Sequence, residues 1–289
     1  MSSCEAMATP DILTRMPVDA AARVIANTAL SVDYNLVALE APELAAQVRP
    51  GQFVMIKAHE GFTPLLRRPF SVFELLRDAN GTTHGISILS KRVGTSTTHI
   101  AQLRAGDRVA CLGPLGQSFE LVDPPVEAWM AAGGVGLAPF MTLAEALLAR
   151  GHAPTLFYGA RRDVDLHCAD LFERMGVRVV YATEDGSRGA RGFVTAPIAA
   201  AFDALPARRD VRVYACGPTP MMRAVATLVA ERGHRCDVSL EQVMGCGVGG
   251  CYSCVVRASD ESGVQHFVRS CLAGPIFDGS RIDWAVLGH

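Results

Sequence analysis

AWMAAGGVGLAP, at residues 128–139, places a short apolar run directly before three glycines and a proline. The uncharged stretch Ala128–Ala144 is 17 residues long and contains several glycines, whereas a membrane-spanning helix needs roughly 20 apolar residues. A buried strand, a glycine turn and the start of a helix account for the stretch better. It therefore indicates one unit of an α/β fold.

The glycine turn is also a candidate nucleotide contact. Glycines between a strand and a helix let a diphosphate approach the backbone at the helix N-terminus. The candidates are Gly133, Gly134 and Gly136. The third glycine of GxGxxG is missing, so a generic turn between a strand and a helix explains these residues equally well.

Strands and helices alternate from this turn to about residue 240. The expected strands are Ala128–Ala132, Thr155–Tyr158, Arg178–Ala182, Arg212–Ala215 and Asp237–Leu240. The expected helices are Pro139–Arg150, Asp165–Met175, Thr195–Ala204 and Thr219–Arg232. This order predicts an α/β domain with a doubly wound parallel sheet in residues 123–240, with Asp123-Pro124-Pro125 as its linker to the preceding domain.

Upstream of the linker the pattern is rich in β-structure. Apolar or alternating runs, separated by turn residues, lie at Ala22–Ala41, Gln52–Ala58, Pro69–Leu76, Gly85–Ser90 and Arg108–Leu112. Ser96–Leu103 is the one expected helix. Short strands at this spacing predict a small antiparallel β-barrel in residues 21–122, preceded by an N-terminal extension of residues 1–20.

The composition is that of a globular chain with about two domains, and it excludes several functions. The 289 residues are 49% apolar and 19% charged, with a formal net charge of −2. No basic field is present that would bind nucleic acid or anionic lipid. The N-terminus has no apolar core of the signal-peptide type, so we expect a cytoplasmic protein that binds no membrane.

Four of the nine cysteines fall within 26 residues near the C-terminus. GCGVGGCYSC, at residues 245–254, and a fourth cysteine downstream give the spacing C-x4-C-x2-C…C, the plant-type arrangement for a [2Fe–2S] cluster. The expected ligands are Cys246, Cys251, Cys254 and Cys271. A structural zinc site is the alternative, but zinc ribbons usually present two separated C-x2-C pairs. Residues 241–289 are too few for an apolar core of their own, so we expect a metal to hold this segment together.

Two further motifs carry candidate contacts. Arg68-Pro69-Phe70-Ser71 lies on an expected barrel strand, where an arginine fork suits a pyrophosphate and a serine hydroxyl suits a flavin ring nitrogen. A surface arginine beside an edge-strand proline is the other explanation. YACGP, at residues 214–218, ends an expected parallel strand, where such sheets bind ligands. Cys216 is either a ligand contact there or a small buried hydrophobe.

The order of these motifs resembles a known family. A barrel with RPFS, followed by a parallel sheet with GGVGLAP and ACGP, resembles the ferredoxin–NADP reductase superfamily over residues 20–240. With the C-x4-C-x2-C-x16-C segment added, the chain is similar to the iron–sulfur flavoprotein subunits of the NAD-linked dihydroorotate dehydrogenases. TEDGS at residues 183–187 and GFVT at residues 192–195 are further matches.

The resemblance implies an FAD site on the barrel. Arg68 to Ser71 match the arginine and serine of the family's FAD-binding RPxS residue for residue. The family's second flavin contact falls on Leu89-Ser90-Lys91, where Ser90 stands in place of an aromatic residue. Its Gly-Thr at a helix start falls on Ser96-Thr97, where backbone amides form an anion site.

The resemblance also implies a nicotinamide dinucleotide site on the sheet. The glycines of both turns would contact it: Gly133, Gly134, Gly136 and Gly217. Cys216 would lie near the nicotinamide and help to position it. After the third strand, Glu184 and Asp185 would repel a 2′-phosphate and accept hydrogen bonds from ribose hydroxyls, which favours NAD over NADP. Arg161 and Arg162, after the second strand, would instead attract a 2′-phosphate and so weaken the preference for NAD.

The family's function is electron transfer without a substrate site on this chain. Electrons would pass from the FMN of a partner subunit, which oxidises dihydroorotate in pyrimidine biosynthesis, through the [2Fe–2S] cluster to FAD and leave as hydride to NAD⁺. Two copies of each chain would form a heterotetramer. The alternatives are the FAD/NAD(P) subunit of a hydrogenase, a sulfide dehydrogenase or a flavin-based transhydrogenase. A zinc-stapled binding module without catalysis is the alternative of another class.

Overall fold

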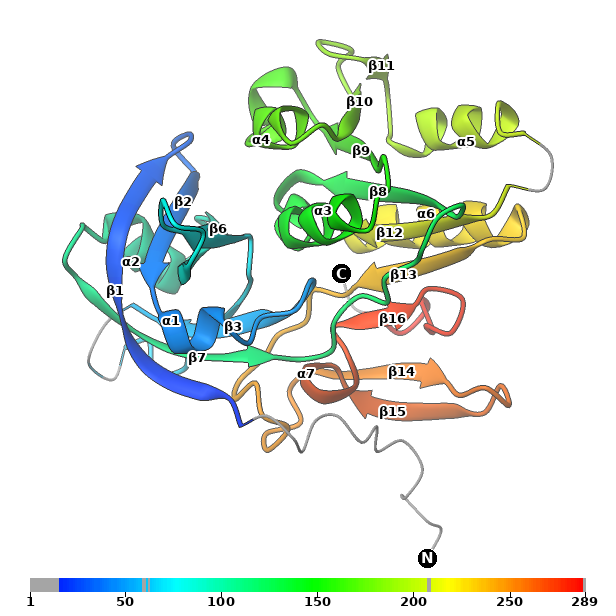
Figure 1. Ribbon diagram of the computed structural model, residues 1–289. Helices are drawn as coiled ribbons and strands as arrows, with labels where there is room; N and C mark the ends of the chain where they lie inside the picture. Colours follow the sequence, from blue (N-terminus) through cyan, green and yellow to red (C-terminus); the bar gives the residue numbers. More distant parts are fainter. Residues whose placement is uncertain (1–15, 59–60, 62, 207–208, 288–289) are drawn as a thin grey trace, which may run out of the picture.

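The computed structural model describes residues 16–58, 61, 63–206 and 209–287. Figure 1 shows a curled antiparallel sheet, a parallel sheet with helices on both faces, and a small C-terminal segment. Of the expected N-terminal extension, residues 1–15 lie outside the described residues, and the first strand of the barrel already begins at Val18. Within the described ranges, no helix combines the length and apolarity needed to cross a membrane.

The first domain is a seven-stranded antiparallel sheet that curls into a half-barrel. In sheet order its strands are β4 (Arg68–Ser71), β3 (Phe53–Lys57), β7 (Arg108–Leu115), β1 (Val18–Ala29), β2 (Tyr34–Glu40), β6 (Thr83–Lys91) and β5 (Glu74–Arg77). Its helices are α1 (Pro42–Ala45) and α2 (Thr95–Gln102). Buried residues alternate along β2 and β7, as they do in strands that face a core on one side.

Two apolar runs of the sequence each form two strands. The run Ala22–Ala41 contains β1 and β2, which pair as a hairpin. The run Pro69–Leu76 contains β4 and β5, which lie at opposite edges of the sheet. Between them, the Val72 amide donates to the carbonyl of Gln52, just before β3, at 3.0 Å. The next amide, of Phe73, donates to Ser87 on β6 at 2.9 Å, so the two bonds draw the edges of the sheet together.

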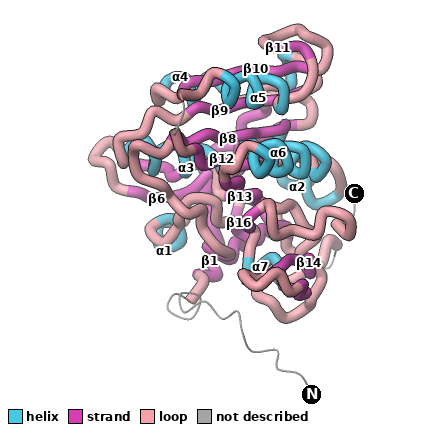
Figure 2. The backbone as a smooth tube through the Cα atoms, turned by 90° about the vertical axis from the view of Figure 1, so that its right-hand side faces the viewer, coloured by secondary structure: helices cyan, strands magenta, loops and turns pink. Residues whose placement is uncertain are grey.

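The second domain is a seven-stranded sheet that is parallel except for its last strand. In sheet order its strands are β11 (Ala190–Arg191), β10 (Arg178–Thr183), β9 (Thr155–Ala160), β8 (Glu127–Gly133), β12 (Val211–Cys216), β13 (Arg235–Ser239) and β16 (Ile276–Asp278). Figure 2 shows them stacked in this order. β11 and β16 are too short to give a strand pattern in the sequence. β16 comes from the C-terminal segment and runs antiparallel to β13.

Helices cover both faces of this sheet, which confirms the doubly wound prediction. One face carries α3 (Phe140–Ala149) and α4 (Ala169–Arg174), and the other carries α5 (Thr195–Asp203) and α6 (Thr219–Glu231). Phe73, Leu89 and Phe119 of the barrel domain pack into the core on the α3 side. The barrel and the parallel sheet therefore share one core.

The C-terminal segment has no apolar core of its own and packs on its neighbours. After β13 an irregular loop leads to the hairpin of β14 (Val255–Ser259) and β15 (Gln265–Arg269), and α7 (Ser270–Ala273) precedes β16. A small apolar cluster joins this segment to the barrel, and its buried members are Phe53, Met55, Leu115, Met244, Cys254 and Cys271. Half of them lie on β3 and β7. Other apolar residues of the segment, such as Val256 and Ile282, pack into the core of the parallel sheet. The segment therefore packs against both domains.

Candidate functional site

The motif Arg68-Pro69-Phe70-Ser71 coincides with β4, an edge strand of the half-barrel. All four residues are half-buried. Phe70 packs on the barrel core, so strand alternation turns Pro69 and Ser71 to the other face. The Arg68 guanidinium donates from one nitrogen to the carbonyls of Leu66 and Arg67, at 3.0 and 3.1 Å. Its remaining N–H groups can donate to a diphosphate.

The second predicted flavin contact forms the end of β6. Leu89 and Ser90 are buried, and Lys91 is exposed. Leu89 belongs to the core that the barrel shares with the parallel sheet. This places the Lys91 ammonium at the boundary between the two domains. With the Arg68 fork on β4, the half-barrel therefore offers two cations and a half-buried edge strand, a set that fits the diphosphate and ring of FAD.

The start of α2 is fixed by one of the two predicted contacts there. Thr97 Oγ1 accepts hydrogen bonds from the amides of Val93 and Gly94, at 2.9 and 3.1 Å, and donates to the Gly94 carbonyl at 3.0 Å. The hydroxyl of Thr97 is thus engaged in shaping the helix start. Ser96 is the member of the pair that can offer its hydroxyl to a ligand.

Two of the three glycines at the end of β8 are required by packing. A Cβ on Gly136 would lie 2.3 Å from the carbonyl oxygen of Cys216, and one on Gly133 would lie 2.5 Å from the sulfur of a methionine on α6. Gly134 differs, because its φ is +55° and a Cβ there would first meet the Tyr34 hydroxyl, 3.6 Å away. The generic packing explanation therefore accounts for Gly133 and Gly136. Gly134 is the glycine that leaves room for a ligand beside the backbone.

Cys216 ends β12 directly beside this turn, in register with Ala132 of β8. Its side chain is buried. Burial, and after it the nearby Glu241 carboxylate, raises the pKa of the Cys216 thiol to about 12. The thiol is therefore protonated at neutral pH, so it can orient a ligand but is no nucleophile. At Gly217, where φ is +153°, a Cβ would lie 3.0 Å from the Gly133 amide, so the two turns are packed against each other.

A ring contact across the domain boundary adds residues that the motifs do not contain. The ring centroids of Tyr34, on β2, and His167, before α4, are 4.6 Å apart, and the Lys91 ammonium lies 5.6 Å from the centroid of the Tyr34 ring. The buried Tyr158 hydroxyl donates toward the carbonyls of His167 and Gly134, at 3.3 and 3.4 Å. Tyr34 thus joins a flavin contact to the nucleotide turn. An aromatic residue in an alternating strand gives no sequence signal of such a role.

Glu241 is a second functional candidate without a motif. It follows β13 by two residues. Glu241 is exposed, but the protein atoms around its carboxylate partly desolvate it and raise its pKa, whereas the Lys91 ammonium lowers it. Its carboxylate is therefore within electrostatic reach of both Lys91 and Cys216, at the place where the flavin and nucleotide residues meet. A single carboxylate after a strand is too common a pattern to predict this.

The acidic pair Glu184-Asp185 follows β10, as the sequence predicts. Ser187 donates to Asp185 Oδ1 from its amide at 2.9 Å and from its hydroxyl at 2.6 Å, and these hydrogen bonds lower the pKa of Asp185. The nearby Arg162 is paired with Asp165 at 3.1 Å. A carboxylate held ionised beside a neutralised arginine favours ribose hydroxyls over a 2′-phosphate.

The four motif cysteines lie together as two pairs. Cys246 lies close enough to Cys251 to influence its pKa, and Cys254 does the same to Cys271. Backbone amides point at two of the sulfurs, since Val248 donates to Cys246 and Cys271 donates to Cys254, each at 3.4 Å. In the described part of the chain, no three cysteine, histidine or carboxylate side chains are grouped to hold one metal ion. Four thiols in one loop region supply the ligand type and number that a [2Fe–2S] cluster needs, and they would equally suit a zinc ion.

Glycines let the cluster loop approach its neighbours closely. At Gly247, where φ is +76°, a Cβ would lie 2.5 Å from Met55 Cγ on β3. At Gly249, where φ is +83°, it would lie 2.5 Å from Leu272 Cδ1. Side chains at either position would push the loop away from the half-barrel or from α7. The loop therefore needs glycine where it wraps the four thiols.

The acidity of the thiols follows their surroundings. Hydrogen bonds from Ser253, and then from Cys246, lower the pKa of the exposed Cys251 to about 6. Burial raises the pKa of Cys271 to about 12. A metal must displace the proton from each thiol that binds it, so Cys251 is the predicted ligand whose proton is lost most readily.

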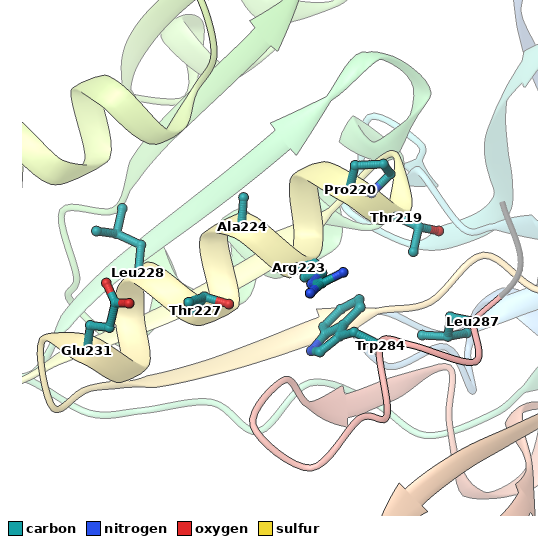
Figure 3. Close-up of a pocket in the computed structure, with 9 residues that line it drawn as sticks. All are labelled: Thr219, Pro220, Arg223, Ala224, Thr227, Leu228, Glu231, Trp284 and Leu287. Atoms are coloured by element: carbon teal, nitrogen blue, oxygen red, sulfur yellow. The ribbon is translucent and has the colours of Figure 1, made fainter.

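Two hollows lie close to these residues, and Cys271 is the one predicted contact among the described residues that line them. A groove of about 530 Å³ follows the outer side of α6 and reaches Trp284 and Leu287 (Figure 3). None of the predicted contacts lines it. A second hollow, of about 230 Å³, lies between the half-barrel and the cluster loop, and Val248 and Cys271 are among its lining residues. The flavin and nucleotide contacts instead lie along the edges of strands and turns.

Three family models match the chain, one for each of its parts. The "Oxidoreductase FAD-binding domain" matches residues 21–119, and the "Oxidoreductase NAD-binding domain" matches residues 130–227. The "Iron-sulfur cluster binding domain of dihydroorotate dehydrogenase B" matches residues 241–283. These matches confirm FAD, NAD and an iron–sulfur cluster as the ligands of the three parts.

Relatives resemble the chain over nearly its whole length. The "Dihydroorotate dehydrogenase B (NAD(+)), electron transfer subunit" of Desulforamulus reducens is 36% identical over 91% of this chain and 97% of its own length. The subunit of the same name from Shouchella clausii is 34% identical, over 88% and 94%. A solved structure of the NADH-dependent reduced ferredoxin-NADP oxidoreductase superimposes with a TM-score of 0.78 at 30% identity, over 93% and 91% of the two chains. The chain belongs to the family of dihydroorotate dehydrogenase B (NAD(+)) electron transfer subunits.

Proposed function

We propose that this chain carries electrons from the flavin of a catalytic partner subunit, by way of its cluster and FAD, to NAD⁺. The partner is an FMN-containing subunit that oxidises dihydroorotate, the substrate in the name of the relatives, in pyrimidine biosynthesis. The three parts of this chain match models for FAD, NAD and an iron–sulfur cluster, which supports oxidation of the substrate C–H bond on the partner.

One observation carries the proposal: the cluster loop and the flavin strand contact the same residue of β3. Gly247 of the loop packs so closely on Met55 that a Cβ would lie 2.5 Å from its Cγ. Met55 is in turn the register partner of Pro69 in β4. Neighbouring strands lie about 4.8 Å apart. A single strand therefore separates the loop from the flavin motif, which supports direct electron exchange between them.

The residues of the chain bind and orient, and the bound groups supply the redox chemistry. FAD exchanges electrons singly or in pairs, which connects a one-electron cluster to a two-electron nicotinamide. Arg68 holds the FAD diphosphate by charge-assisted hydrogen bonds, and Ser71 hydrogen-bonds the flavin ring. The protonated Cys216 orients the nicotinamide, and Asp185 accepts from the ribose. Hydride transfer needs no acid–base pair from the protein.

The exposed side of the cluster loop faces the partner. Cys251 is exposed, and beside it Val248 and Tyr252 are 49% and 64% exposed. Apolar side chains around a metal ligand are typical of a surface that another subunit covers. We infer a heterotetramer with two copies of each chain. We also infer a cytoplasmic location, because reducing conditions keep the cluster thiols available to iron.

A second candidate is the FAD/NAD(P) subunit of a flavin-based transhydrogenase. The solved NADH-dependent reduced ferredoxin-NADP oxidoreductase favours it, since 93% of this chain superimposes on that structure. The two candidates require the same three ligand sites in this chain. They differ in the partner and its substrate.

Activity with and without the partner tests the proposal. The isolated chain should reduce an artificial acceptor with NADH but oxidise no dihydroorotate. Adding an FMN-containing (β/α)8 subunit should produce dihydroorotate:NAD⁺ activity, and the two chains should co-elute as a heterotetramer. Turnover of dihydroorotate by the isolated chain, at a rate that the partner does not increase, would contradict the division of labour. Co-purification with a different redox partner would favour the second candidate.

A further inference from the structure

Ser253 occupies a position in the cluster loop that the cysteine spacing does not specify. It lies between the second and third motif cysteines, and the motif requires no particular residue there. In the structure its hydroxyl oxygen accepts a hydrogen bond from the Gly245 amide at 2.8 Å. The same oxygen lies 3.2 Å from Cys251 Sγ. Ser253 therefore links the beginning of the loop to its most exposed cysteine.

The protons and lone pairs of the two groups determine which of them donates the second hydrogen bond. A serine hydroxyl has one proton and two lone pairs, and the Gly245 amide uses one lone pair. The proton remains available for Cys251. A cysteine bound to iron is a thiolate and can only accept. Once the cluster is in place, Ser253 must therefore be the donor and Cys251 the acceptor.

This donor differs in kind from those of the neighbouring ligands. The donors to Cys246 and Cys254 are the backbone amides of Val248 and Cys271. Almost any residue would supply them. The donor to Cys251 is a side chain, so the identity of residue 253 decides whether the bond exists. Hydrogen bonds to the sulfurs of an iron–sulfur cluster, like its exposure, set the reduction potential, because they stabilise the added negative charge.

We propose that Ser253 is a positioning residue of the cluster, whose hydroxyl donates to the Cys251 thiolate and raises the reduction potential of the cluster. The inference rests on the proposed assignment of Cys251 as a ligand. The Gly245 amide holds the hydroxyl oxygen in place, so the donor is oriented before the cluster is reduced. The bond acts at the exposed ligand, on the side from which electrons enter from the partner.

An isosteric pair of variants isolates the hydroxyl. Threonine and valine have nearly the same branched shape, and valine has a methyl group where threonine has its hydroxyl. Ser253→Thr and Ser253→Val therefore add nearly the same volume to the loop. Iron and sulfide content should match wild type in both. In an EPR-monitored redox titration, the Ser253→Thr cluster should keep the wild-type midpoint potential, and the Ser253→Val cluster should move to a more negative one. Ser262→Ala, which removes a hydroxyl bound to Asp260 in the same segment, should leave the potential unchanged.

Each alternative result is decisive. Equal potentials in Ser253→Thr and Ser253→Val would overturn the proposal, and so would loss of iron from both, since the shape of the side chain and not its hydroxyl would then matter. Loss of iron from Ser253→Val alone would support the contact. Cys251→Ser separates this inference from the ligand assignment. A full cluster in that variant would contradict the assignment itself, whereas its loss together with equal potentials would contradict the role of Ser253 only.

Discussion

The parallel sheet and the cluster segment prepare for their ligands by opposite means. The sheet buries an apolar core on each face, and its ligand-binding turns are fixed by contacts such as that of Gly136 with the Cys216 carbonyl. The cluster segment packs partly into one of these cores and partly into a small cluster of six buried residues, half of which belong to the barrel and two of which are cysteines. In the sheet, the nucleotide meets turns that are already packed. In the segment, two of the cysteines that would bind the cluster are themselves part of the apolar core. Removing a ligand should therefore affect the segment far more than the sheet.

The largest expected effect is the loss of the cluster on Cys254→Ser. Serine is a harder ligand with a much higher pKa, and position 254 is buried. We expect the EPR signal and the iron to disappear completely, while FAD content and NADH-dependent dye reduction remain. Cys236→Ser, at an equally buried site outside the motif, should keep its iron. If Cys246, Cys251, Cys254 and Cys271 could each be replaced without loss of iron, the ligand assignment would be wrong.

Alanine in place of single glycines separates the two regions. Gly136→Ala forces a methyl group against the Cys216 carbonyl, an overpacking cost of about 1–3 kcal/mol. It should lower the melting temperature and raise the KM for NADH about tenfold without loss of iron. Gly247→Ala should do the reverse, with less iron and an unchanged KM, because its methyl group would meet Met55. Gly250→Ala, where a Cβ meets nothing within 4 Å, is the control. A change in both readouts from either variant would contradict the comparison.

Arg68→Ala tests the ligand site of the half-barrel. A charge-assisted bond to a phosphate contributes about 1.5–3 kcal/mol, so the affinity for FAD should fall roughly tenfold or more. Flavin absorbance after extensive dialysis measures the effect. Arg67→Ala removes the neighbouring arginine, which pairs with Asp19 at 2.8 Å, and should retain FAD. Equal FAD retention in both variants would rule out Arg68 as the diphosphate ligand.

The smallest expected effect concerns the contact of Tyr34 with His167. Burial lowers the pKa of His167, so the folded protein resists its protonation. Below the usual histidine pKa of about 6.5 the unfolded chain takes up the proton, and this part of the stability is lost as the pH falls. The melting temperature of wild type should therefore decrease slightly from pH 7.5 to pH 5.5. His167→Phe should reduce that decrease, and an unchanged pH dependence would show that the ring contact does not couple to protonation.

The sequence predicted the features that depend on residues close together in the chain. Strand and helix periods identify the elements, and the spacing of Cys246, Cys251 and Cys254 places three thiols within one loop. The period of a strand does not name its neighbour, so the separation of β4 and β5 to opposite edges follows only from the bonds of Val72 and Phe73. β16 has three residues and escapes any pattern.

The candidate site was predictable to the extent that it is made of motifs. Tyr34, His167 and Glu241 come from three distant segments, and each is an ordinary residue in its own context. Their role arises because the barrel and the sheet share a core. The glycine turn shows a packing role that the motif does not reveal, since Gly133 and Gly136, the predicted nucleotide contacts, are also required by the contact of two turns.

The pairing of β16 with β13 gives the cluster segment the topology of an inserted module. Ser239 and Ile276 are register partners, so the chain leaves the sheet and returns to it about one strand spacing, 4.8 Å, away. The loop and hairpin between them do not stand apart from the sheet, since Val256 and Ala258 belong to the apolar core on its α6 side. Cutting the chain after β13 would therefore strip off β16, leave β13 as an unpaired edge that is prone to aggregation, and uncover part of that core. The segment that carries the cluster thiols is thus also a structural part of the nucleotide domain.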